Sequence, residues 1–193
     1  MIVRTVIPLL CLVGNLQVEK PLSRESLLKI ANSHPPAENP SIEELKLLPF
    51  AQEWEERTIW TYFDGDTRKE KYRGNDYWSS DGRFHISRMT HLNGAPQPEE
   101  EQTINLTTYD AKRKIFITYL LNTDDFIIAE GSYASEKKTL TLEGKSSSTG
   151  AALLCTMRIK QGNRTESNID LYVDGERMAT GRSRAHPLVN DSE

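Results

Sequence analysis

The sequence predicts a mainly β protein: an antiparallel up-and-down β-barrel of about ten strands, preceded by one or two short helices. After Trp54, helical spacing gives way to short alternating segments and hairpin-type turns. No segment between the predicted strands is long enough for a parallel crossover. Twisted strands in a single meander tend to close, because closure removes exposed edges. A flat two-sheet sandwich is the alternative architecture.

Composition narrows the class of protein. The chain has 193 residues, of which 24 are Lys or Arg and 28 are Asp or Glu, so the formal net charge is −4. Apolar residues make up 37% of it. These figures exclude collagen-like, disulfide-dense and compositionally disordered chains. The acidic balance also argues against a nucleic-acid partner, since nucleic-acid binders present a basic surface.

Residues 1–18 are predicted to be a signal peptide. One positive charge, Arg4, precedes the apolar run 5–13. This run is too short for a membrane span, which needs about 20 apolar residues. We therefore expect an extracytoplasmic protein, periplasmic or secreted; a buried N-terminal strand or helix is the alternative. Removal of the signal takes Cys11 away and leaves Cys155, which we expect to be a small buried hydrophobe.

Residues 19–50 are predicted to form a segment of helix and linker. Ser23 is a candidate N-cap for a first short helix, and the proline-rich residues 32–40 form a linker. A second short helix is expected after Ser41, because Ser41 and Glu44 have the spacing of a capping box.

Residues 51–187 are predicted to be the barrel domain, and residues 188–193 a flexible tail. Residues 115–121 and 126–129 are apolar on both faces, whereas most other segments alternate. Hairpin turns are predicted at four dipeptides that tolerate positive φ: Asp64-Gly65, Asp81-Gly82, Asn93-Gly94 and Asp174-Gly175.

Four segments together resemble motifs of the DUF1579 family. In chain order they are residues 49–55 (PF-x-G-x-W in the family), 81–84 (GGRF), 108–116 (GYD…K-x-Y) and 130–144 (EG-x-Y…KTLTL-x-G). The similarity spans about residues 45–185, although Gln52 and Asp81 stand where the family motifs have glycine. The family is of unknown function, and the resemblance implies a calycin-like barrel related in shape to lipocalins and fatty-acid-binding proteins.

The same resemblance implies a role for Trp54 and Arg184. In calycin-like barrels, a tryptophan at the start of the first strand is usually covered by a basic residue from the last strand. The resemblance carries these roles onto Trp54 and onto Arg184 or Arg182. A guanidinium stacked on an indole contributes about 0.5–2 kcal/mol, so this pair is expected to close one end of the barrel.

Candidate ligand-binding residues lie on the last strand and in the early aromatic cluster. Arg182, Arg184 and His186 share one strand face by their spacing of two. If this face points inward, Arg182 would hold a carboxylate through paired hydrogen bonds. Trp60 and Trp78 are candidates for lining an apolar pocket, and core packing is the alternative role for both.

Metal and cofactor sites are not predicted. His85 and His91 lie on one strand face but about 20 Å apart at ~3.3 Å per residue, which is too far to share a metal ion. Haem held through a single histidine is an alternative, as in nitrobindin-type barrels. No Gly-x-Ser-x-Gly nucleophile motif occurs, and the sequence assigns no catalytic residue.

The predicted function is that of an exported barrel that binds a small, mainly apolar molecule in its interior. An internal cavity of a few hundred Å³ with one or two charged groups would favour it. A filled interior would favour a structural or protein-interaction barrel. An enzyme of unknown reaction is the second alternative, and it would require convergent polar residues with perturbed pKa values.

Overall fold

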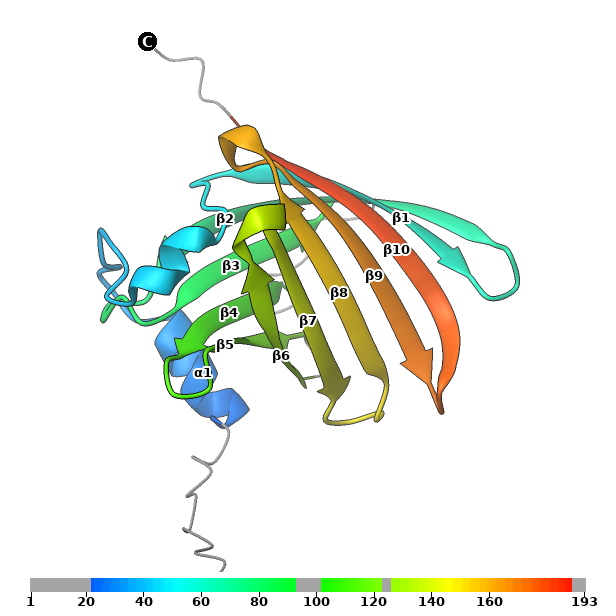
Figure 1. Ribbon diagram of the computed structural model, residues 1–193, viewed down its shortest axis with the longest axis horizontal. Helices are drawn as coiled ribbons and strands as arrows, with labels where there is room; N and C mark the ends of the chain where they lie inside the picture. The colour runs from blue at the N-terminus through cyan, green and yellow to red at the C-terminus, as the bar shows by residue number, and fades with distance from the viewer. Residues whose placement is uncertain (1–21, 93–101, 123–125, 189–193) are drawn as a thin grey trace, which may run out of the picture.

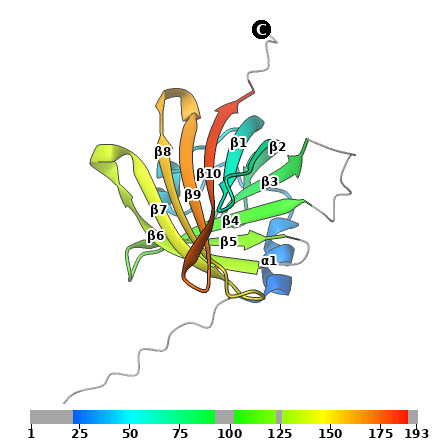
Figure 2. The same cartoon turned by 90° about the vertical axis from the view of Figure 1, so that its right-hand side faces the viewer.

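The computed structural model describes residues 22–92, 102–122 and 126–188. Ten antiparallel strands form a closed barrel in which each strand pairs with the next along the chain and the last returns to the first (Figures 1 and 2). The predicted up-and-down barrel is confirmed, and its closure excludes the sandwich. The strands are β1 (Trp54–Tyr62), β2 (Thr67–Trp78), β3 (His85–His91), β4 (Thr103–Asp110), β5 (Ile115–Leu121), β6 (Phe126–Ala134), β7 (Thr139–Ser146), β8 (Ala152–Ile159), β9 (Thr165–Val173) and β10 (Glu176–Pro187).

Closure depends on long antiparallel pairing between β1 and β10, in which Trp54 is opposite Pro187 and Tyr62 is opposite Ala179. This pairing leaves no free sheet edge in the barrel. At the β9–β10 hairpin, Asp174 and Gly175 have φ values of 52° and 83°. Both central residues of this turn thus adopt the left-handed conformation that the dipeptide predicts.

The helix α1 (Arg24–Ala31) covers the outer face of β3, β4 and β5 (Figure 1). The hydroxyl of Ser23 accepts a hydrogen bond from the amide of Ser26, so the predicted N-cap is confirmed. Leu27 and Ala31 of the helix are fully buried in a cluster with Ile86, Ile104, Leu106, Tyr119 and Leu121. This cover explains why residues 115–121 are apolar on both faces: one face meets the interior and the other meets the helix.

A second cover lies over one end of the barrel. The 3-10 helix η1 (Glu43–Leu47) and residues 48–50 form a cap segment over the end where β2 leads into β3, and Ala37 forms an isolated bridge with Trp78 there. The predicted capping box at Ser41 is wrong: the N-cap is Ile42, with no side-chain hydrogen bond. The amide of Ser41 instead donates to the carbonyl of Gly82, 2.9 Å away, so a tertiary contact holds Ser41 outside the helix.

Further features of the sequence lie outside the described residues. They are the predicted signal segment with Cys11, the Asn93-Gly94 turn and the end of the predicted tail. None of the helices in the described part of the chain has the length and apolar character needed to cross a membrane.

Leucines 45 and 47 provide a matched test of the cap segment. Leu45 is fully buried against the barrel, whereas Leu47 is 44% exposed on the same 3-10 helix. We expect Leu45→Ala to lower the free energy of unfolding by about 2–5 kcal/mol, through lost burial and the cavity left behind. Leu47→Ala should change it by about 0.5 kcal/mol or less. Chemical denaturation measures both; equal losses would show that the cap does not pack as described.

Candidate functional site

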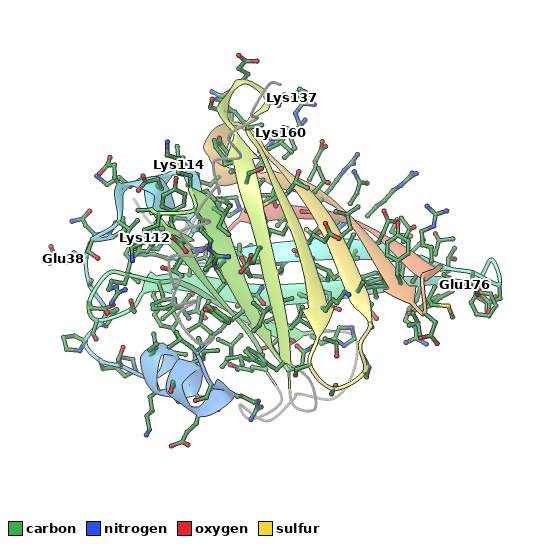
Figure 3. The ribbon with its side chains drawn as sticks, turned by 60° about the horizontal axis from the view of Figure 1, so that its bottom comes forward. Glu38, Lys112, Lys114, Lys137, Lys160 and Glu176 are labelled. Atoms are coloured by element: carbon green, nitrogen blue, oxygen red, sulfur yellow. The ribbon has the colours of Figure 1, made fainter. Side chains whose placement is uncertain are left out.

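A cavity of about 250 Å³ lies inside the barrel beneath the cap segment. Inward-facing side chains of nine of the ten strands line it, β6 being the exception among the described residues. A closed barrel of this size can retain such space because its interior is wider than the facing side chains can fill. The charged residues labelled in Figure 3, such as Lys112 and Glu176, lie at the periphery of the barrel and do not line the cavity, so they do not set its charge.

One side of the cavity is apolar. It is formed mainly by strands β5, β7, β8 and β9, which contribute Leu120, Leu140, Leu142, Leu153, Met157 and Ile169. Leu140, Leu142 and Leu153 also belong to the buried cluster that packs against Leu45 and Leu48 of the cap segment. The apolar wall is therefore continuous with the protein core.

The other side of the cavity is polar and comes from β1 to β4. Glu56, Asp76, His85, Ser87 and Asn105 line it. Asp76 lies opposite Ser87, which in turn lies opposite Asn105, so the register places these three side chains in one row across neighbouring strands. The cavity thus has the amphipathic wall expected of a site for a mainly apolar molecule with a polar group.

Asp76 is a buried carboxylate whose hydrogen bonds come from the protein. Its Oδ1 accepts from Trp54 Nε1 at 2.9 Å and from Ser87 Oγ at 2.8 Å, and its Oδ2 accepts from the amide of Ala51 at 3.0 Å. Burial by itself would raise the pKa of Asp76, but His85 and these donors outweigh it and lower the pKa. Asp76 therefore anchors Trp54 and the start of β1.

His85 lies beside this carboxylate. Its Nε2 is 3.6 Å from Asp76 Oδ2, beyond hydrogen-bonding distance, and it has no hydrogen-bond partner. The rings of Phe50 and Trp78 pack against the imidazole, with centroids 5.9 and 5.2 Å away. Its orientation is consequently set by aromatic packing beneath the cap.

Glu56 is the second carboxyl of the cavity, and its environment differs from that of Asp76. Desolvation raises its pKa, and the hydroxyls of Thr58 and Ser183 oppose this only in part. Thr58 Oγ1 donates to Glu56 Oε1 at 2.9 Å, whereas Ser183 Oγ faces the carboxyl without reaching hydrogen-bond geometry. No lysine or arginine in the described chain lines the cavity to neutralise Glu56.

Three buried polar atoms of the cavity wall have no hydrogen-bond partner: His85 Nε2, Asn105 Oδ1 and Ser183 Oγ. Leaving a buried donor or acceptor unpaired costs about 1–3 kcal/mol. Two of these atoms lie near a carboxyl of the same cavity: His85 Nε2 is 3.6 Å from Asp76 Oδ2, and Ser183 interacts with Glu56. Asn105 Oδ1 is the one of the three for which no such neighbour is found among the described residues.

Cys155 also lines the cavity, where it is partly buried and unpaired. Desolvation, reinforced by the charge of Glu56, raises the pKa of the Cys155 thiol to about 11. Because the thiolate is the nucleophilic form, this environment disfavours covalent chemistry at Cys155.

The last strand does not meet the condition for carboxylate binding by Arg182, which is that its arginine-bearing face points inward. Arg182, Arg184 and His186 are exposed, and neither arginine lines the cavity. The inward face carries small residues instead, namely Ala179, Gly181, Ser183 and Ala185. The physical reason is space: Gly181 lies against the Trp60 ring, where even a Cβ would come within 2.8 Å of it. Because Arg182 is exposed and does not line the cavity, it is not placed to bind a carboxylate there.

The expected cover of Trp54 by Arg184 is also wrong. The Arg184 side chain is 83% exposed and lies 3.6 Å from Glu166. Trp54 is held by its hydrogen bond to Asp76 and by close contact with the backbone of Gly74, where a Cβ would lie 2.3 Å from the ring. The tryptophan therefore packs at the barrel end as expected, but with a carboxylate and a glycine as its partners.

The other two tryptophans do not line the cavity. Trp60 donates to Glu70 Oε2 at 2.9 Å, and Trp78 stacks on Phe50 with ring centroids 5.0 Å apart. Both pack within the structure, as the core-packing alternative predicts. The residues missed in the sequence, above all Glu56 and Asp76, share the inward faces of Trp54 and Trp78 by a spacing of two, which is the signal that could have identified them.

The site does not fit haem through a single histidine. His85 is enclosed by aromatic rings and Asp76, and a cavity of about 250 Å³ is smaller than the roughly 300–1,000 Å³ of pockets for drug-sized ligands. Within the described residues, no three His, Cys, Asp or Glu side chains converge as a metal site.

Asp76→Asn tests the role of the buried carboxylate. Because the pKa of Asp76 is lowered in the folded protein, its ionisation stabilises the fold above its unfolded pKa, and this contribution is lost as pH falls through the folded pKa. We expect Asp76→Asn to cost about 1.5–3 kcal/mol at neutral pH and to weaken the acid dependence of stability. Thermal unfolding across acidic pH measures this, with the exposed Asp174→Asn as control. An unchanged pH profile would contradict the assignment.

Glu56→Gln should have the opposite pH signature. The pKa of Glu56 is raised on folding, so its contribution is most favourable below the unfolded pKa and is lost as pH rises through the folded pKa. The variant should gain stability relative to the wild type between about pH 4 and about pH 8. Melting temperatures at both pH values test this. A constant difference between the two proteins would refute a desolvated Glu56.

Neither a scan against family models nor a search of curated proteins finds a match to this chain. The resemblance of residues 49–55 and 130–144 to the DUF1579 family therefore stays a prediction. The geometry of the cavity carries the functional argument.

Proposed function

We propose that the barrel binds a small, mainly apolar molecule that carries a polar group. The observation that carries this proposal is the interior cavity of about 250 Å³, apolar on one side and lined by unpartnered polar atoms on the other. A dry apolar cavity of about 150 Å³ accommodates a benzene molecule, so the space suits one ring with a short chain.

The two alternatives fit the structure less well. A structural barrel with a filled core would bury apolar side chains throughout, and its buried polar atoms would be paired with one another. An enzyme would need convergent polar residues with perturbed pKa values. Asp76 and Glu56 have shifted pKa values, but Asp76 is occupied by three hydrogen bonds from the protein, and the raised pKa of the Cys155 thiol keeps it protonated. Binding therefore accounts for the cavity more completely than either alternative.

The proposal also includes export from the cytoplasm and membership of the DUF1579 family. The charge and apolar run of residues 1–18 support a signal segment, and the four motif-like segments support a DUF1579-type protein. Such a protein would carry or sequester its ligand outside the cytoplasm. N-terminal sequencing of the protein from its host tests export directly: a retained Met1 would refute cleavage.

Ser167→Phe is expected to abolish binding by filling the cavity. Ser167 faces the cavity from β9, whereas the next residue, Asn168, is exposed on the outside of the same strand. With 2-phenylethanol as a neutral probe, isothermal titration calorimetry should show binding to the wild type and at least about tenfold weaker binding to Ser167→Phe.

Asn168→Phe is the matched control, because it adds the same ring to the outer face. It should bind the probe as the wild type does, within about twofold. Native mass spectrometry of the protein purified from its host would then show the mass of the natural ligand. Equal affinities for Ser167→Phe and the wild type would contradict binding in the cavity.

A further inference from the structure

The polar side of the cavity holds two carboxyl groups, of which Glu56 is desolvated and has a raised pKa. Glu56 and Asp76 both line it, and no lysine or arginine does so in the described residues. Two histidines line it as well: His85 lies next to Asp76, and His186 is exposed. The cavity therefore favours a positively charged ligand over a negatively charged one.

The two carboxyls have different roles. Asp76 receives hydrogen bonds from an amide, an indole and a hydroxyl, and His85 lies beside it. Glu56 receives one hydrogen bond, from Thr58. The protein thus satisfies Asp76 and leaves Glu56 with unused acceptor capacity.

The groups that interact with Glu56 supply no compensating charge. Tyr72 and Cys155 both interact electrostatically with it, and the pKa of each is raised, by desolvation above all. Both side chains are therefore neutral at neutral pH. Thr58 and Ser183 offer only hydroxyls.

We propose that the cavity selects a small aryl- or alkylamine, with its ammonium group bound by Glu56 and its apolar body against the leucine-rich wall. This inference rests on the proposed binding function and names the ligand class. The ammonium has three donors, and the Glu56 carboxyl, which receives one hydrogen bond from Thr58, has acceptor capacity left for them.

Charge complementarity argues against the other ligand classes. A carboxylate ligand would bring a third carboxyl group into a site that already holds two, where water does not screen the repulsion. A neutral alcohol can bind, but it leaves Glu56 without a counterion. An ammonium supplies the missing charge and converts a desolvated carboxyl into a hydrogen-bonded ion pair.

Three probes of one shape test the inference: 2-phenylethylamine, 2-phenylethanol and phenylacetate. Calorimetric titration of the full chain at neutral pH should give the tightest binding for the amine, about tenfold or more above the alcohol, and the weakest for the carboxylate. An alcohol that binds as tightly as the amine, or a carboxylate that binds tightest, would overturn the amine assignment and leave the proposed function standing. If none of the three binds, both fail.

Glu56→Gln identifies the residue responsible. It keeps the size of the side chain and removes its charge, so the amine should lose about tenfold in affinity while the alcohol changes by about twofold or less. Glu56→Asp, which keeps the charge, should retain the preference for the amine. The control is Glu55→Gln, because Glu55 pairs with Lys71 and Arg73 and does not line the cavity. An unchanged amine preference in Glu56→Gln would overturn the proposal.

Discussion

The antiparallel pairing of β1 with β10 is the constraint on which the rest of the structure depends. It closes the meander, and its register places Thr58 opposite Ser183 and Arg57 opposite Arg184. Because side chains alternate across a strand, a shift of one residue would move the arginines of β10 into the interior and expel the small residues that face it. Trp60 makes that shift costly, since its ring occupies the space above Gly181. Register and interior packing therefore determine each other.

The closed barrel has two apolar regions that must be covered: the interior at one end of the barrel, and part of the outer face of the sheet. The cap segment meets the first need by burying Leu45 and Leu48, and α1 meets the second by burying Leu27 and Ala31. Both covers come from the chain that precedes β1. The cap leaves space beneath it because the side chains below are partly small and polar, such as Thr165 and Ser183. The cavity is thus a consequence of how the barrel is filled.

The sequence predicted the strands, their antiparallel order, the closure and the Ser23 cap, since each depends on local alternation, turn chemistry or the absence of crossovers. It failed where tertiary contacts decide. Ser41 has the spacing of a capping box, yet its amide bonds to Gly82 across the cap. Both faces of β10 contain polar residues, so alternation could not show which face points inward; the run of small residues at 179, 181, 183 and 185 was the usable sign. The polar row of Asp76, Ser87 and Asn105 needs the registers of three strands, which no local pattern contains.

Two carboxyls in one interior show how a structural group differs from a binding group. Burying an uncompensated charge costs several kcal/mol. At Asp76 the fold avoids this cost with three hydrogen-bond donors, one of which is the indole of Trp54. At Glu56 the same interior offers a hydroxyl from Thr58 and little else, while Asn105 and Ser183 keep unpartnered atoms in the same cavity. A buried carboxyl with a purely structural role is expected to be surrounded by hydrogen-bond donors from the protein, as Asp76 is. The unused acceptor capacity at Glu56 is what the proposed ammonium ligand would fill.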